Sequence, residues 1–166
     1  MILLVVSIGF CAPLTGDDYK NINKQKRTET LIYETCKPLS STGFSMIGVQ
    51  FDRYLSEAVY VGGTAYGAVS GGRGGYALGS INLGYTAGSP LFVDLKVMVG
   101  GSGGGGVGVK GGLLIQLMVT IGYRLTPDLE CRFGFGKYFS LDNNFEADIL
   151  NIGISFSTQH LFLPLY

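Results

Sequence analysis

Apolar and polar residues alternate through most of the chain, most clearly between residues 113 and 135, where two alternating stretches flank a Thr126-Pro127-Asp128 turn. A period of two places apolar side chains on one face of a β-strand and polar side chains on the other. The apolar faces here carry Leu113, Ile115, Leu117, Val119, Ile121 and Tyr123, then Leu129, Cys131, Phe133 and Phe135. Long apolar faces backed by faces with few charges and many glycines are typical of transmembrane barrel strands.

The same alternation predicts seven strands, near residues 44–52, 57–69, 75–87, 91–100, 107–124, 129–138 and 146–157. Turn residues separate them, mainly Gly, Pro, Asn, Asp and Ser. Bacterial single-chain barrels have an even number of strands, so an eighth is expected from residues 28–36, with the C-terminal tail as the alternative. The predicted fold is therefore all-β, an antiparallel up-and-down transmembrane β-barrel of about eight strands, with an interior filled by side chains.

Composition supports a membrane barrel over a soluble domain. Charged residues make up 14% of the chain, against about a quarter in typical soluble proteins, and there are 27 glycines. The net charge of zero gives no electrostatic basis for binding nucleic acid. No apolar run reaches the length of a membrane-spanning helix. An apolar chain without such a helix favours a barrel.

The chain divides into four segments by composition. Residues 1–14 form an apolar segment similar to a secretory signal, for which an N-terminal strand is the alternative. Residues 15–42 are a polar leader that includes the candidate first strand, residues 43–157 are the barrel, and residues 158–166 are a C-terminal tail.

The last strand carries a resemblance to a known class. Leu150, Ile152, Ile154 and Phe156 resemble the C-terminal targeting strand of bacterial outer-membrane β-barrels, although ten residues follow the aromatic residue here. The segment from Gly122 to Leu129 resembles the short periplasmic hairpins of that class. This resemblance implies a location in the bacterial outer membrane, with the Thr126-Pro127-Asp128 turn in the periplasm and short loops outside.

Several polar residues fall on the faces opposite the apolar ones, where a barrel has its interior. They are Asp52, Asp94, Lys96, Gln116, Arg124, Glu130 and Arg132. Their charges are in near balance, and unpaired charge in a narrow interior would be costly, so we expect a paired network that locks the barrel.

Two further features concern contacts rather than the interior. The glycine run from Gly100 to Gly106 is expected to form a turn, and Gly103, Gly104, Gly105 and Gly106 are candidates for close contact with a partner. A disulfide between Cys36 and Cys131 is a further hypothesis, since the cell envelope is oxidising.

Candidate chemistry is sparse. The glycine run from Gly100 to Gly106 also matches a dinucleotide-binding fingerprint, but no helix is predicted to follow it and bind a phosphate. The cysteines lack the paired spacing of metal sites, and we expect no metal and no cofactor. Lipid A deacylases resemble the chain in size and barrel class and use a neighbouring His and Ser. The surroundings of His160, the single histidine, do not reproduce that arrangement.

These observations predict an outer-membrane barrel with a structural, anchoring or assembly role and without a catalytic site. The expected partners are outer-membrane lipid and other envelope proteins or further copies of the chain, and not nucleic acid. Two alternatives stay open. One is a lipid-modifying envelope enzyme. The other is a soluble β-barrel that binds a small apolar ligand, which requires the apolar faces to point inward.

Overall fold

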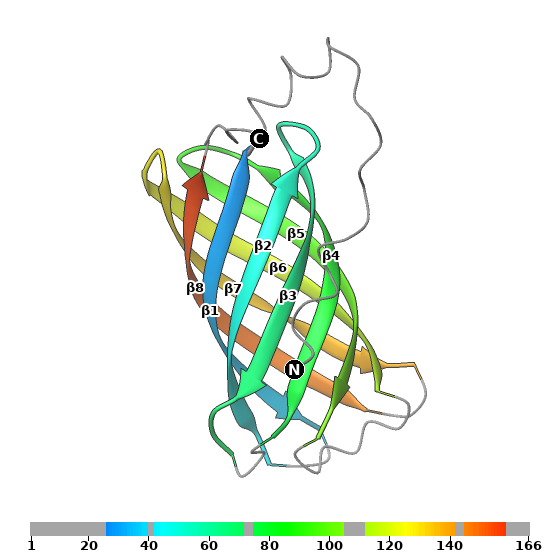
Figure 1. Cartoon of the computed structure of the whole chain (residues 1–166). Helices are drawn as coiled ribbons and strands as arrows, with labels where there is room; N and C mark the ends of the chain where they lie inside the picture. The colour runs from blue at the N-terminus through cyan, green and yellow to red at the C-terminus, as the bar shows by residue number, and fades with distance from the viewer. Residues whose placement is uncertain (1–25, 40–41, 72–74, 105–111, 142–144, 159–166) are drawn as a thin grey trace, which may run out of the picture.

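The computed structural model describes residues 26–39, 42–71, 75–104, 112–141 and 145–158. Within them, eight strands form one closed antiparallel barrel in which each strand pairs with its sequence neighbours and the last pairs with the first (Figure 1). The strands are β1 (Arg27–Pro38), β2 (Phe44–Tyr54), β3 (Val59–Ala68), β4 (Ala77–Ala87), β5 (Leu91–Gly103), β6 (Leu113–Thr126), β7 (Leu129–Ser140) and β8 (Glu146–Thr158). The predicted fold class and strand number are confirmed.

The eighth strand comes from the polar segment, as expected, and closes the barrel. It is β1, which pairs with β8 from Arg27 opposite Thr158 to Pro38 opposite Ala147. The barrel thus begins at the first strand expected within the polar leader. Residues 159–166, which supplied the alternative strand, lie outside the described residues.

The glycine run differs from expectation. Strand β5 continues through Gly103, so Gly100, Gly101 and Gly103 belong to the sheet and not to a turn. The backbone becomes left-handed only at Gly104, with a φ of 85°, which a residue without a side chain adopts readily. Residues 105–111 lie outside the described part, and the strand predicted to begin at residue 107 is described from Leu113.

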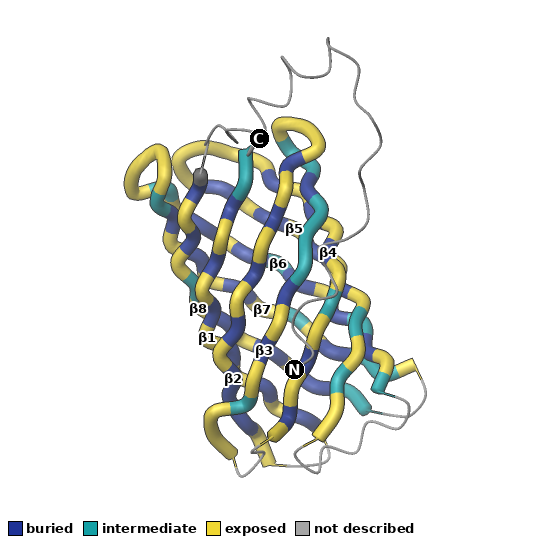
Figure 2. Tube along the Cα trace, viewed as in Figure 1, coloured by how far each residue is buried: buried dark blue, intermediate teal, exposed yellow. Residues whose placement is uncertain are grey.

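Burial alternates residue by residue along the strands (Figure 2). Most of the exposed strand positions carry apolar side chains, which form the outer surface. The outer face of β5 is representative, since Leu91, Leu95 and Val99 are 61%, 51% and 46% exposed. Polar side chains such as Gln50, Asp94 and Gln116 are buried inside. The soluble alternative required apolar faces that point inward, and the observed orientation contradicts it. No helix among the described residues is long and apolar enough to cross a membrane.

The two ends of the barrel differ. The connections 55–58, 88–90 and 127–128 are short and lie at the end where β1 begins and β8 finishes (Figure 1). We call this the short-turn end. At the opposite end β1, β3, β5 and β7 finish and β2, β4, β6 and β8 begin, and more residues of the sequence separate the consecutive strands there; we call it the long-loop end. In outer-membrane barrels the short turns are periplasmic and the longer loops extracellular.

Candidate functional site: the barrel interior

The interior has two halves of different chemistry. Toward the long-loop end it is filled by an apolar cluster that includes Phe44, Met46, Leu78, Met98 and Leu114, each at most 4% exposed. Toward the short-turn end it is filled by buried carboxylates, cations, amides and hydroxyls. Both halves are side-chain cores, as expected for eight strands.

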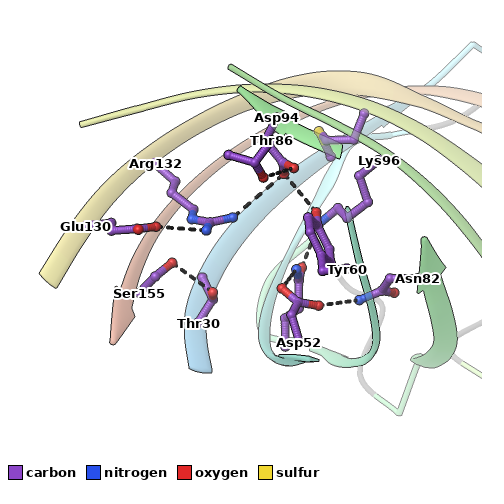
Figure 3. Close-up of polar contacts among 12 residues, drawn as sticks. Thr30, Asp52, Tyr60, Asn82, Thr86, Asp94, Lys96, Glu130, Arg132 and Ser155 are labelled. Atoms are coloured by element: carbon purple, nitrogen blue, oxygen red, sulfur yellow. Dashed lines mark hydrogen bonds and ion pairs between the residues drawn. The ribbon is translucent and has the colours of Figure 1, made fainter. Parts of the chain in front are cut away.

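Asp94 is the centre of the polar half nearest the short turns (Figure 3). Its carboxylate accepts hydrogen bonds from the Tyr60 hydroxyl at 2.9 Å and the Thr86 hydroxyl at 3.0 Å. The Arg132 guanidinium lies 3.7 Å away and also donates to Glu130 at 2.8 Å. This one set of contacts joins four strands across the interior: β3, β4, β5 and β7.

Glu130 collects the cations at the short-turn end. Its carboxylate accepts from Lys26 at 3.1 Å and from Arg124 at 3.2 Å in addition to Arg132. The guanidinium carbons of Arg124 and Arg132 each lie 5.2 Å from the centre of the Phe92 ring, a distance typical of cation–π contacts. Ion pairs and an aromatic ring therefore close this end of the barrel.

A second group surrounds Asp52. Its carboxylate accepts from the Gln50 amide at 2.5 Å and from the Asn82 amide at 3.4 Å (Figure 3). Gln50 in turn accepts from the buried ammonium of Lys96 at 2.5 Å. Since no described carboxylate lies within 4 Å of the Lys96 ammonium, an amide links this cation to Asp52.

A third group surrounds Glu34, at the boundary with the apolar half. Its carboxylate accepts four hydrogen bonds from neutral donors: Tyr138 at 2.6 Å, and Tyr66, Gln116 and Asn151 at 3.2 Å each. These donors come from β7, β3, β6 and β8. Because Glu34 is fully buried, the four bonds replace the water that the carboxylate loses.

Glycines on the inner face make room for the large aromatic residues. A Cβ atom at Gly84 would collide with the Tyr60 ring, and one at Gly122 would collide with the Phe92 ring. Each ring therefore lies directly against the backbone of a neighbouring strand. This close approach lets two of the largest buried side chains fit into the narrow interior.

The structure places most of the predicted interior residues together. Asp52, Asp94, Lys96, Gln116, Glu130 and Arg132 are buried inside, and Arg124 is partly exposed at the short-turn end. Sequence reasoning missed Glu34. Its signal was present, because Leu31 and Tyr33 alternate with Thr30 and Glu34, but this alternation is short and lies within a charged segment.

The hypothesis of a disulfide between Cys36 and Cys131 is wrong. Cys36 is buried inside the barrel, whereas Cys131 is exposed on the outer wall, and both are free. A strand directs alternate residues to opposite faces, so these two thiols lie on opposite sides of the sheet. Of the candidate contact glycines, Gly103 and Gly104 are exposed, and Gly105 and Gly106 lie outside the described residues.

The interior carboxylates are engaged in structural contacts. Within the described residues there is no cluster of three or more His, Cys, Asp or Glu side chains that could bind a metal ion. His160, on which the enzyme alternative depends, lies outside them. The hydrogen bonds and ion pairs of these carboxylates join strands across the interior and stabilise the barrel.

The fold is that of small outer-membrane β-barrels. No family model and no curated protein matches the sequence. Among solved structures, Neisserial surface protein A is 14% identical, with a TM-score of 0.55, 80% of this chain and 96% of that chain being covered. The N-terminal barrel domain of Pseudomonas aeruginosa OprF is 12% identical, with a TM-score of 0.52, and the match covers 80% of this chain and 98% of that chain. The outer membrane enzyme PagL is 11% identical, with a TM-score of 0.53, and the match covers 76% of this chain and 98% of that chain. At these identities the likeness concerns the fold alone.

Proposed function

We propose that this chain is an outer-membrane β-barrel with a structural, anchoring or assembly role, exerted through its wall. One observation carries the proposal: a barrel with an apolar outer surface encloses an interior that is filled along its length. Outward residues such as Ile81, Leu95 and Phe133 match the lipid-facing belt of membrane barrels. The similar solved structures include outer-membrane proteins, which supports the same membrane.

The filled interior favours an anchor over a pore. Tyr60 and Phe92 are at most 1% exposed near the short-turn end, as are Met46 and Met98 in the apolar half. Ions would have to displace these side chains and break the contacts of Asp94 and Glu34 to pass. The wall is then the surface that remains available for function.

One part of the wall is suited to close contact with a partner. Two cross-strand rows on β3, β4 and β5 contain only small residues: Ala65, Gly79 and Gly101 in one, and Gly67, Ala77 and Gly103 in the other. A Cβ atom added at Gly67, Gly79 or Gly103 would meet nothing within 4 Å. This small-residue wall lets another membrane-embedded segment approach the backbone, as small residues do between membrane helices. The partner we propose is another envelope protein or a second copy.

The test begins with the full chain expressed with a dependable signal sequence. Membrane fractionation and heat-modifiable gel migration report insertion and folding, and in-cell cross-linking reports neighbours. Gly79→Leu is expected to reduce cross-linking, and Cys131→Leu, which enlarges a small outward residue on the other side of the barrel, is the matched control. Recovery as a soluble protein without detergent would overturn the membrane assignment. Identical cross-linking in both variants would overturn the role of this wall.

A further inference from the structure

We propose that β3 and β4 form the contact surface of a dimer of this chain, in which two copies are related by a two-fold axis along the membrane normal. This inference rests on the proposed function and names the partner of the small-residue wall. The partner follows from the shape of the surface, because a projecting side chain and an open stretch of glycine and alanine lie side by side on these strands (Figure 1).

The projecting side chain is Ile81 on β4. It is 75% exposed, more than any other large apolar side chain in the described part of the chain. Its cross-strand neighbour on β3 is Gly63, and the preceding outward residue on β4 is Gly79. Because these two neighbours have no side chain, Ile81 stands above the surface around it.

The open stretch is the outer face of β3 toward the long-loop end, where the outward residues are Gly63, Ala65 and Gly67. A Cβ atom added at Gly67 would meet nothing within 4 Å. One added at Gly63 would meet only the Ser80 carbonyl oxygen, at an ordinary contact distance of 3.4 Å. A side chain of a second barrel can therefore reach the backbone here, as side chains do beside small residues of membrane helices.

The register of β3 and β4 favours a second copy as the partner. Gly63 and Ile81 form one cross-strand pair, so they lie about 5 Å apart and at similar depth in the membrane. Two copies inserted in one membrane have the same orientation. A two-fold axis between β3 and β4 then places Ile81 of each copy over Gly63 of the other. Each copy supplies both the projecting side chain and the space for it, as an isologous contact requires.

The distribution of charge agrees with such a contact. A two-fold axis brings equivalent faces together, so charged side chains close to the axis would meet charges of the same sign. The outward positions of β3 and β4, as the structure describes these strands, carry no charged side chain. The outward faces of β1 and β7, in contrast, carry Glu29, Lys37 and Lys137. The β3–β4 face therefore avoids this repulsion.

The area of the surface indicates a weak dimer. Strand β3 has 10 residues. At about 3.4 Å per residue, and with three strands about 4.8 Å apart, the patch on β3, β4 and β5 covers roughly 500 Å² on each copy. Two copies together bury roughly 1,000 Å², slightly less than the roughly 1,200 Å² at which stable interfaces begin. We therefore expect copies that associate and separate within the membrane.

The experiment measures energy transfer between two pools of the full chain, labelled on a terminal tag with a donor or an acceptor dye and folded together into lipid vesicles. Dilution with lipid should lower the transfer along a monomer–dimer curve. Ile81→Gly and Gly63→Ile should each reduce the association constant about fivefold, because one substitution acts twice in a symmetric contact. Ile152→Gly, the same change on the outer face of β8, is the matched control and should leave the constant unchanged.

A variant that combines Gly63→Ile with Ile81→Gly is the sharper test. It moves the projecting side chain to β3 and the space to β4, and the two-fold axis again brings them together. We expect this exchanged variant to regain the association that either single substitution loses. Heat-modifiable gel migration verifies that each variant is folded.

A disulfide measurement needs only a small change of the surface. In a chain whose native cysteines are replaced by serine, Ala65→Cys should give a disulfide-linked dimer on oxidation, and Ile152→Cys on the other side of the barrel should not. Equal linkage of both would overturn the proposed contact surface.

The outcomes separate this inference from the function on which it rests. Absence of energy transfer between folded barrels at high protein-to-lipid ratio would overturn the dimer, whereas in-cell cross-linking to another envelope protein would still support the proposed function. Unchanged association in Ile81→Gly, or no recovery in the exchanged variant, would also overturn the dimer. A chain that is recovered as a soluble protein without detergent would overturn both proposals.

Discussion

Glu34 provides the sharpest test of the interior, because its carboxylate is fully buried and is held by four neutral donors. Glu34→Ala removes the acceptor for all four at once. A buried donor left without a partner costs about 1 kcal/mol or more, so we expect the free energy of unfolding to fall by about 4 kcal/mol, before the cost of the cavity is added.

Glu34→Gln separates hydrogen bonding from charge. The amide oxygen can still accept from Tyr66, Gln116 and Asn151, and the amide nitrogen can donate to the Tyr138 hydroxyl, which is able to accept. The substitution also removes a buried charge that has no described cation within 4 Å. We therefore expect Glu34→Gln to remain within about 1 kcal/mol of the unmodified chain.

The assay is urea unfolding of the full chain in lipid vesicles. Because the chain has no tryptophan, unfolding is followed by circular dichroism and by heat-modifiable gel migration. Glu29→Ala, which removes an exposed outward carboxylate from the same strand, is the control and should change little. Equal destabilisation by Glu34→Gln and Glu34→Ala would refute the reasoning, since it would mean that the charge of Glu34, acting at longer range on Lys96, is what the barrel requires.

Three further predictions follow from the packing. Gly122→Leu should lower the free energy of unfolding by about 1–3 kcal/mol because the leucine side chain must displace the Phe92 ring. Gly79→Leu places its side chain in open space and should have little effect on the same unfolding curve. Equal effects of the two substitutions would contradict the packing account. In the folded barrel with the third cysteine replaced by serine, a membrane-permeant maleimide should label Cys131 and leave Cys36 unmodified until the chain is unfolded; rapid labelling of both would show that the interior is open. In planar lipid bilayers, the purified barrel should give no resolved single-channel current, and steady conductance would contradict the filled interior.

Much of the fold could be predicted from local pattern. The direction of a strand side chain depends only on its parity, so the sequence alone assigns Leu95, Phe133 and Ile152 to the outer face and Asp94 and Arg132 to the interior. The closing strand was also expected, because bacterial single-chain barrels have an even number of strands. The same rule separates the two cysteines, since Cys131 lies on the apolar outer face and Cys36 on the inner face.

Which interior residues meet was decided by the tertiary structure. Glu34 and Tyr138 are 104 positions apart, and their contact depends on the register of every pairing around the closed sheet. The same holds for Lys96. The balance of charges led us to expect a carboxylate as its partner, whereas in the structure its ammonium donates to the Gln50 amide oxygen. A period of two specifies the face of a residue but not its height along the barrel axis. That height is set by the register of the strand pairs and by barrel closure, and the space beside Gly84 and Gly122 decides where the Tyr60 and Phe92 rings fit.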